Sequence, residues 1–137
     1  MKLTGKIFIP HNDGKPNKNG HIYPKEVIEE IVEKFNNLEK PMFGHLGYPS
    51  TTIFDIDDTT QQPSHKITSV REEDVNLIGD IEILDTPNGD ILKSIIDGSV
   101  IRPLVEGSVN EDGTINVTKI RSFDVIPKSN DAFNRED

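Results

Sequence analysis

The chain has 137 residues, with 24 Asp and Glu against 15 Lys and Arg, which gives a formal net charge of −9. This acidic balance argues against a protein that binds the phosphate backbone of nucleic acids, because such proteins need clustered Lys and Arg. The absence of cysteine excludes disulfides, thiol nucleophiles and cysteine-based zinc sites. No run approaches the ~20 apolar residues of a membrane span, and the N-terminus lacks the apolar centre of a signal peptide, so we expect no membrane partner.

The first half of the chain predicts one strand and one helix. Residues 2–9 alternate as a half-buried strand does, with one face formed by Leu3, Gly5, Ile7 and Ile9. A loop rich in Pro, Asn, Asp and Gly follows over residues 10–22. Residues 24–38 predict the clearest helix, because apolar residues recur at helical spacing, at Val27, Ile28, Ile31, Val32 and Phe35. Residues 41–63 show no clear period.

The second half predicts two strand pairs separated by a short helix. Residues 65–71 and 75–84 form the first pair, and in the second of these strands one face is formed by Val75, Leu77, Gly79, Ile81 and Ile83. A helix then opens at Thr86-Pro87 and stops at Gly98, with an inward face formed by Ile91, Leu92, Ile95 and Ile96. Residues 100–109 and 114–126 form a final hairpin, in which a phase slip between Val117 and Ile120 predicts a bulge. Residues 128–137 are polar, and we expect them to fray.

This order of elements predicts an α+β fold, in which a mostly antiparallel, barrel-like sheet is flanked by about two helices. We find no repeat and no linker that divides the chain. We therefore expect one domain over residues 1–133, followed by a polar tail over residues 134–137.

Candidate chemical groups are scattered along the chain. No local metal-ligand spacing relates the four histidines, so we expect ordinary surface or loop residues, with no metal and no cofactor, at His11, His21, His45 and His65. The acidic run at residues 55–58 lacks the glycine and distal glutamate of a calcium loop, and we expect a solvated loop there. For nucleophilic catalysis the candidates are Ser99 or Ser108 as nucleophile, His45 or His65 as base, and Asp124 as supporting group.

Three segments, taken in order, resemble one protein family. They are NKNGHIYPKEVIEEIVEKF (17–35), SHKITSVREEDVNLIGDIEILDTPNGDILKSIIDG (64–98) and GTINVTKIRSFDVIPKSNDAF (113–133). Together they resemble the prohead (head-maturation) proteases of tailed phages, especially the myovirus type, which are distantly related in fold to the herpesvirus assemblins. The resemblance implies a serine protease that trims scaffold and capsid proteins, built on a β-barrel flanked by helices.

The same resemblance implies that the catalytic pair is missing. The family's histidine lies in a loop of the form G-E-L-x-H-P, which matches GHLGYP here, so Tyr48 takes the place of the histidine and His45 that of the acid. The family's nucleophile lies shortly after the second helix, where this chain has residues 100–107 (VIRPLVEG), without serine. Counting from the helix end places Leu104 near the nucleophile position, and counting back from Gly107 places Arg102 or Pro103 there. Asp124 matches the supporting position.

We therefore expect a phage protein with a prohead-protease-like fold and no peptidase activity, serving virion assembly as a structural or binding component. One alternative is an active, divergent maturation protease that pairs His45 with Ser99 or Ser108. Another is an acidic phage protein that inhibits a host factor. The expected partners are phage structural or assembly proteins, or a second copy of the chain, with no nucleic acid. The expected location is the host cytoplasm during infection, with the virion as a second location.

Overall fold

The computed structural model describes residues 1–10, 15–46 and 62–133. Its elements in chain order are β1 (Lys2–Ile9), α1 (Lys25–Asn36), β2 (Met42–Gly44), β3 (His65–Glu73), β4 (Asn76–Ile83), α2 (Pro87–Ile95), the 3-10 turn η2 (Ile96–Gly98), β5 (Ser99–Val109), β6 (Ile115–Pro127) and the 3-10 turn η3 (Lys128–Asn130). The predicted helices and strands are all present within a few residues of their expected bounds. The three-residue strand β2 is an addition, in a segment where no period was found.

Four of the strands form one antiparallel sheet in the order β1-β4-β3-β2. The predicted inner face of β4 is confirmed, since Leu77, Ile81 and Ile83 are buried. The predicted face of β1 is wrong at Ile7, which is 47% exposed, whereas Phe8 lies in the core together with Ile9, which is buried as predicted. The reason is local: the register with β4 shifts between Leu3 and Lys6 and again between Ile7 and Ile9, and Gly5 adopts a φ of +66°. Such bulges reverse the faces to which later side chains point.

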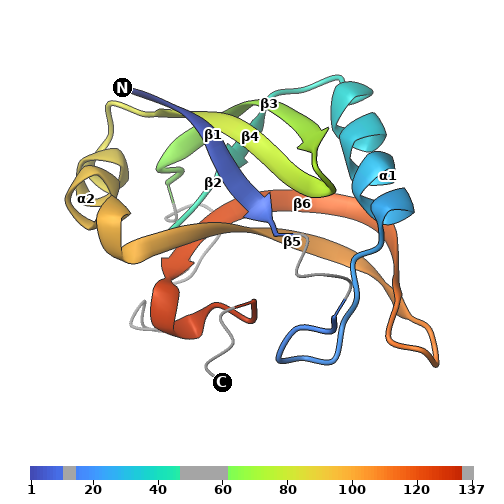
Figure 1. Ribbon diagram of the computed structural model, residues 1–137. Coiled ribbons are helices and arrows are strands. Elements are labelled where there is room, and N and C mark those ends of the chain that lie inside the picture. The colour runs from blue at the N-terminus through green and yellow to red at the C-terminus, as the bar shows by residue number, and fades with distance from the viewer. Residues whose placement is uncertain (11–14, 47–61, 134–137) are drawn as a thin grey trace.

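The strands β5 and β6 form a long antiparallel hairpin that runs below the four-stranded sheet in Figure 1. The predicted phase slip is confirmed: Gly107 pairs with Val117 and Glu106 with Lys119, so Thr118 is an extra residue on β6. A second shift follows between Leu104 and Val105. These irregularities keep Val117, Ile120 and Phe123 buried although they are not spaced by two.

The two sheets pack face to face around a shared apolar core. Phe8 of β1 and Phe123 of β6 are both fully buried, and their ring centroids lie 4.8 Å apart. The helix α1 covers one end of this core with Val27, Ile28 and Ile31, which confirms the predicted apolar face of residues 24–38. Figure 1 shows α1 and α2 at opposite ends of the two sheets.

The expectation of a barrel-like sheet needs correction. In the part of the chain that the structure describes, the strands form two separate sheets and no closed barrel. At one side the sheets are joined by a single bridge between Leu46 and Val125. At the other side, between β1 and β5, the junction is a side chain: the Arg102 guanidinium donates to the Ile7 carbonyl oxygen at 2.9 Å. The result is an α+β fold with mostly antiparallel strands and two helices.

Two smaller expectations also need correction. The helix α2 begins as predicted, with the Thr86 hydroxyl accepting from the Gly89 N–H at 3.0 Å. Its predicted inward face is only partly correct, because Ile91 is exposed and, of the four residues predicted to face inward, Leu92 alone is fully buried. Residues 128–133 do not fray, because Asp131 is buried and bound by Arg102. Residues 134–137 lie outside the described part of the chain.

Candidate functional site

Two segments distant in sequence meet beside the second half of β6. The residues that follow β2 reach β6 through the Val125 N–H, which donates to the His45 carbonyl oxygen at 3.0 Å. The start of β3 reaches the same strand through His65, whose Nε2 lies 2.7 Å from the Phe123 carbonyl oxygen. This junction brings together His45, His65 and Asp124, three of the residues that the sequence singled out.

His45 and Asp124 lie side by side at the edge of β6. The His45 Nδ1 is 3.9 Å from the Asp124 Oδ1, and the same carboxylate oxygen accepts from the His45 backbone N–H at 3.0 Å. The carboxylate thus fixes the backbone of His45, while the ring distance is longer than a hydrogen bond. A catalytic triad contains an imidazole hydrogen-bonded to a carboxylate, and here the two groups are neighbours without that hydrogen bond.

His65 is fully buried, so the expectation of an ordinary surface or loop histidine is wrong for this residue. Its Nε2 faces a carbonyl oxygen, which only accepts, so Nε2 carries the proton and Nδ1 is the acceptor. Burial lowers the pKa of His65 from its usual range. The hydrogen bond to Phe123 and the charge of Asp124 raise this pKa, and His45 lowers it. His65 is therefore neutral at pH 7.

The Ser64 hydroxyl donates to the Nδ1 of His65 at 2.7 Å, a contact that the sequence did not predict. A serine bonded to a neutral imidazole resembles a nucleophile and its base. Both side chains are 0% exposed, however, and the far side of the ring holds a backbone carbonyl where a triad has a carboxylate. The pair joins β3 to β6 inside the protein, and no substrate could approach Ser64 in this arrangement.

The segment expected to hold a nucleophile forms the middle of β5. Arg102 pairs with Asp124 and Leu104 pairs with Ser122, so these four residues face the same side of the hairpin. Arg102 forms a two-pronged ion pair with Asp131, with nitrogen–oxygen distances of 2.9 and 2.8 Å. Leu104 is 50% exposed. Neither side chain has an oxygen, so neither can attack a carbonyl.

The candidate serines lie elsewhere on β5. Ser99 is nearly buried, pairs with Pro127, and donates its hydroxyl to the Ile95 carbonyl oxygen at 2.7 Å. Ser108 pairs with Asn116 near the hairpin turn. Since β5 rises ~3.3 Å per residue, Ser108 is about 20 Å along the strand from the level of Asp124. The structure does not bring Ser108 to either histidine.

Ser122 was not considered from the sequence, yet it is two residues from Asp124 on the same face of β6 and is nearly buried. Within the described residues no hydrogen bond joins Ser122 to His45 or His65. In the sequence, Ser122 is marked only by its place in the segment RSFDVIP, two residues before the candidate Asp124.

The remaining candidates lie apart from this junction. His21 lines a separate hollow with Tyr23 against the far half of β5. Tyr48, His11 and the acidic run at residues 55–58 lie outside the described part of the chain. Over residues 1–10, 15–46 and 62–133, no group of three or more His, Cys, Asp or Glu side chains is placed to hold a metal ion. The same ranges contain no helix that is both long and apolar enough to cross a membrane.

Comparison with solved structures finds a protein of similar fold. The chain superposes on the bacteriophage T4 capsid assembly protease, gp21, with a TM-score of 0.56 over 92% of this chain and 90% of that chain. The sequence identity is 17%, so the likeness concerns the fold. No protein-family profile matches the sequence, and no curated protein matches it either.

Proposed function

We propose that this chain is a component of tailed-phage head assembly that uses a protease-like fold for binding and has no peptidase activity. The support is the middle of β5. Where the resemblance implies a serine nucleophile, the strand carries Arg102, Pro103 and Leu104, and the Arg102 side chain is committed to an ion pair with Asp131.

The histidine position supports the same proposal. The resemblance implies Tyr48 in the place of the general base, and a phenol with a free pKa near ~10 accepts a proton poorly at neutral pH compared with an imidazole near ~6.5. Without both nucleophile and base, the covalent route is lost even where the fold persists.

The proposed partners are phage structural or assembly proteins, or a second copy of the chain. The proposed location is the host cytoplasm during infection, and then the virion. We further propose that residues 1–133 act as one domain in this role.

One observation favours a second candidate, an active and divergent maturation protease. His45 and Asp124 lie beside each other and are partly exposed, as a base and its supporting group would be. This candidate requires a serine hydroxyl to reach His45, and Ser99 and Ser108 are its proposed nucleophiles.

A complementation experiment separates the two candidates. A phage that lacks the coding sequence of this chain should yield fewer intact heads, because an assembly component is missing. We expect complementation by the Ser99→Ala, Ser108→Ala double variant to restore the yield as well as the unaltered chain does. Failure of a folded double variant would favour the protease, and full head yield without the chain would contradict an assembly role.

A further inference from the structure

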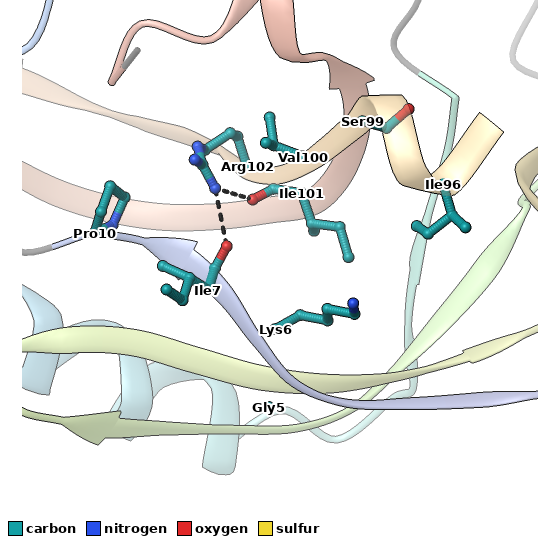
Figure 2. Close-up of a pocket in the computed structure, with 9 residues that line it drawn as sticks. All are labelled: Gly5, Lys6, Ile7, Pro10, Ile96, Ser99, Val100, Ile101 and Arg102. Atoms are coloured by element: carbon teal, nitrogen blue, oxygen red, sulfur yellow. Dashed lines mark hydrogen bonds between the residues drawn. The ribbon is translucent and has the colours of Figure 1, made fainter. Parts of the chain in front are cut away.

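The open junction between the two sheets forms a groove. The strand β1 pairs only with β4, and β5 pairs only with β6, among the strands that the structure describes. Between these two edges lies a hollow of about 390 Å³, shown in Figure 2 and lined by Gly5, Lys6, Ile7, Pro10, Ile96, Ser99, Val100, Ile101 and Arg102. It lies on the β5 side of the hairpin, whereas His45 lies beyond β6.

At one level of the groove, Arg102 already bonds a backbone carbonyl oxygen of each strand. The Nη1 of Arg102 donates to the carbonyl oxygens of Ile7 and Ile101, each at 2.9 Å, and thereby bridges the two strands (Figure 2). Unpaired strand edges are templates for a further strand, and an extended peptide that binds in this way satisfies backbone groups and places alternate side chains in pockets.

The lining of the groove is mostly apolar, and Lys6 adds one positive charge to it. Ile7 is 47% exposed at its rim, beside the partly buried Ile96 and Val100. Among the residues that the structure describes, the ionisable lining residues are Lys6 and Arg102, of which Arg102 is paired with Asp131, and none is Asp or Glu. Lys6 forms no ion pair within the described ranges, and residues 1–10 contain Lys2 and Lys6 but no acid, in a chain whose net charge is −9.

This charge distribution indicates which kind of peptide would bind in the groove. An edge lysine normally discourages strand pairing, because a neutral or basic strand would bury its charge without a partner. An acidic strand would instead pair with Lys6 and place its apolar side chains against Ile7. We propose that the groove between β1 and β5 binds an extended, acidic peptide segment of a partner protein.

The test is fluorescence anisotropy with the full chain at low ionic strength. The probe is a blocked, fluorescein-labelled peptide of about eight alternating Glu and Val residues, since a single strand is commonly about that long. A peptide of alternating Lys and Val serves as its control. We expect saturable binding of the acidic peptide, no binding of the basic one, and weaker binding as salt is added.

Two matched variants locate the binding site. Lys6→Glu and Lys119→Glu change the net charge equally, but Lys119 is exposed on β6 away from the groove. We expect Lys6→Glu to weaken binding by about tenfold or more and Lys119→Glu by less than about twofold, because local charge governs the contact. Ile7→Thr keeps a strand-forming residue and should weaken binding through lost apolar contact.

Three outcomes would overturn the proposal: no binding of the acidic peptide, an equal loss in both lysine variants, or concentration-dependent self-association that Lys6→Glu abolishes. The last result would assign the groove to a second copy of the chain. The assay measures only peptide binding. A negative result would therefore overturn the proposal for the groove and would not bear on whether the chain has peptidase activity.

Discussion

Gly44 lies directly against the His65 ring and the Phe123 carbonyl oxygen. A Cβ atom built on Gly44 would lie inside contact distance of the His65 Nε2 and of that carbonyl oxygen. The same two atoms form the hydrogen bond between β3 and β6. The absence of a side chain at this position therefore allows the buried histidine to reach β6.

Gly44→Ala should lower the free energy of unfolding by about 2–3 kcal/mol, because an added methyl group forces the packed junction apart. Gly98→Ala is the matched control, since nothing lies within 4 Å of a Cβ atom built there. Urea unfolding of both variants measures the difference. Equal stability of the two would mean that the junction is loosely packed.

The protonation of His65 should make stability depend on pH. The pKa of folded His65 lies below its usual value of 6.5, so the unfolded chain binds the proton more tightly. The stability that the neutral ring contributes is present above pH ~6.5 and is lost as the pH falls through the folded pKa. Protonation would also place a hydrogen on Nδ1, where the Ser64 hydroxyl now donates.

We expect the free energy of unfolding to decrease between about pH 7 and pH 5, and to decrease less in His65→Gln. Both proteins retain the other three histidines, so the difference between the two curves isolates His65. Parallel curves would contradict a buried, neutral His65.

At the scale of elements, Arg102 joins three parts of the fold. From β5 its guanidinium binds the Ile7 carbonyl of β1, both carboxylate oxygens of Asp131, and the face of the Phe133 ring at 5.5 Å. The Arg102 and Asp131 side chains are 14% and 7% exposed. This arrangement attaches residues 131–133 to the outer face of the hairpin.

Arg102→Lys should destabilise the protein by about 1–3 kcal/mol, because an ammonium group cannot bind the carboxylate with two prongs and also reach β1. Arg121→Lys, which alters the exposed pair of Arg121 with Glu106 on the same hairpin, should leave stability nearly unchanged. Chemical unfolding measures both, and limited proteolysis should detect earlier cleavage near residues 131–133 in Arg102→Lys. Equal behaviour of the two variants would contradict the joining role of Arg102.

At the scale of the whole molecule, the sequence predicted the elements better than their assembly. The periods of α1 and β4 are long enough to reveal both the element and its buried face. The strand β2 has only three residues, too few to show a period, and the bulges in β1 reverse the expected faces of Ile7 and Phe8. Whether the two sheets close into a barrel depends on contact between β1 and β5, which are distant in sequence, and no local sequence pattern predicts that contact.

The candidate site was predictable only in part. His45 and Asp124 were candidates for a base and its support, and they lie together although they are 79 positions apart. The pair of Ser64 and His65 was not predicted. Neighbouring residues on a strand point to opposite faces, so a bond between their side chains is not expected. Ser64 lies just before β3, where this rule does not apply. The pairing of Arg102 with Asp131 was missed because residues 128–137 had the composition of a frayed tail.

The central proposal is that this fold, which is similar to that of a capsid assembly protease, contains no serine that can be acylated. Intact-mass measurement after treatment of the concentrated protein with a fluorophosphonate tests it most directly, with Ser99→Ala, Ser108→Ala and Ser122→Ala alongside. We predict no adduct and no self-cleavage in folded protein after long incubation. A single adduct that disappears in one of these variants would contradict the account and identify the nucleophile.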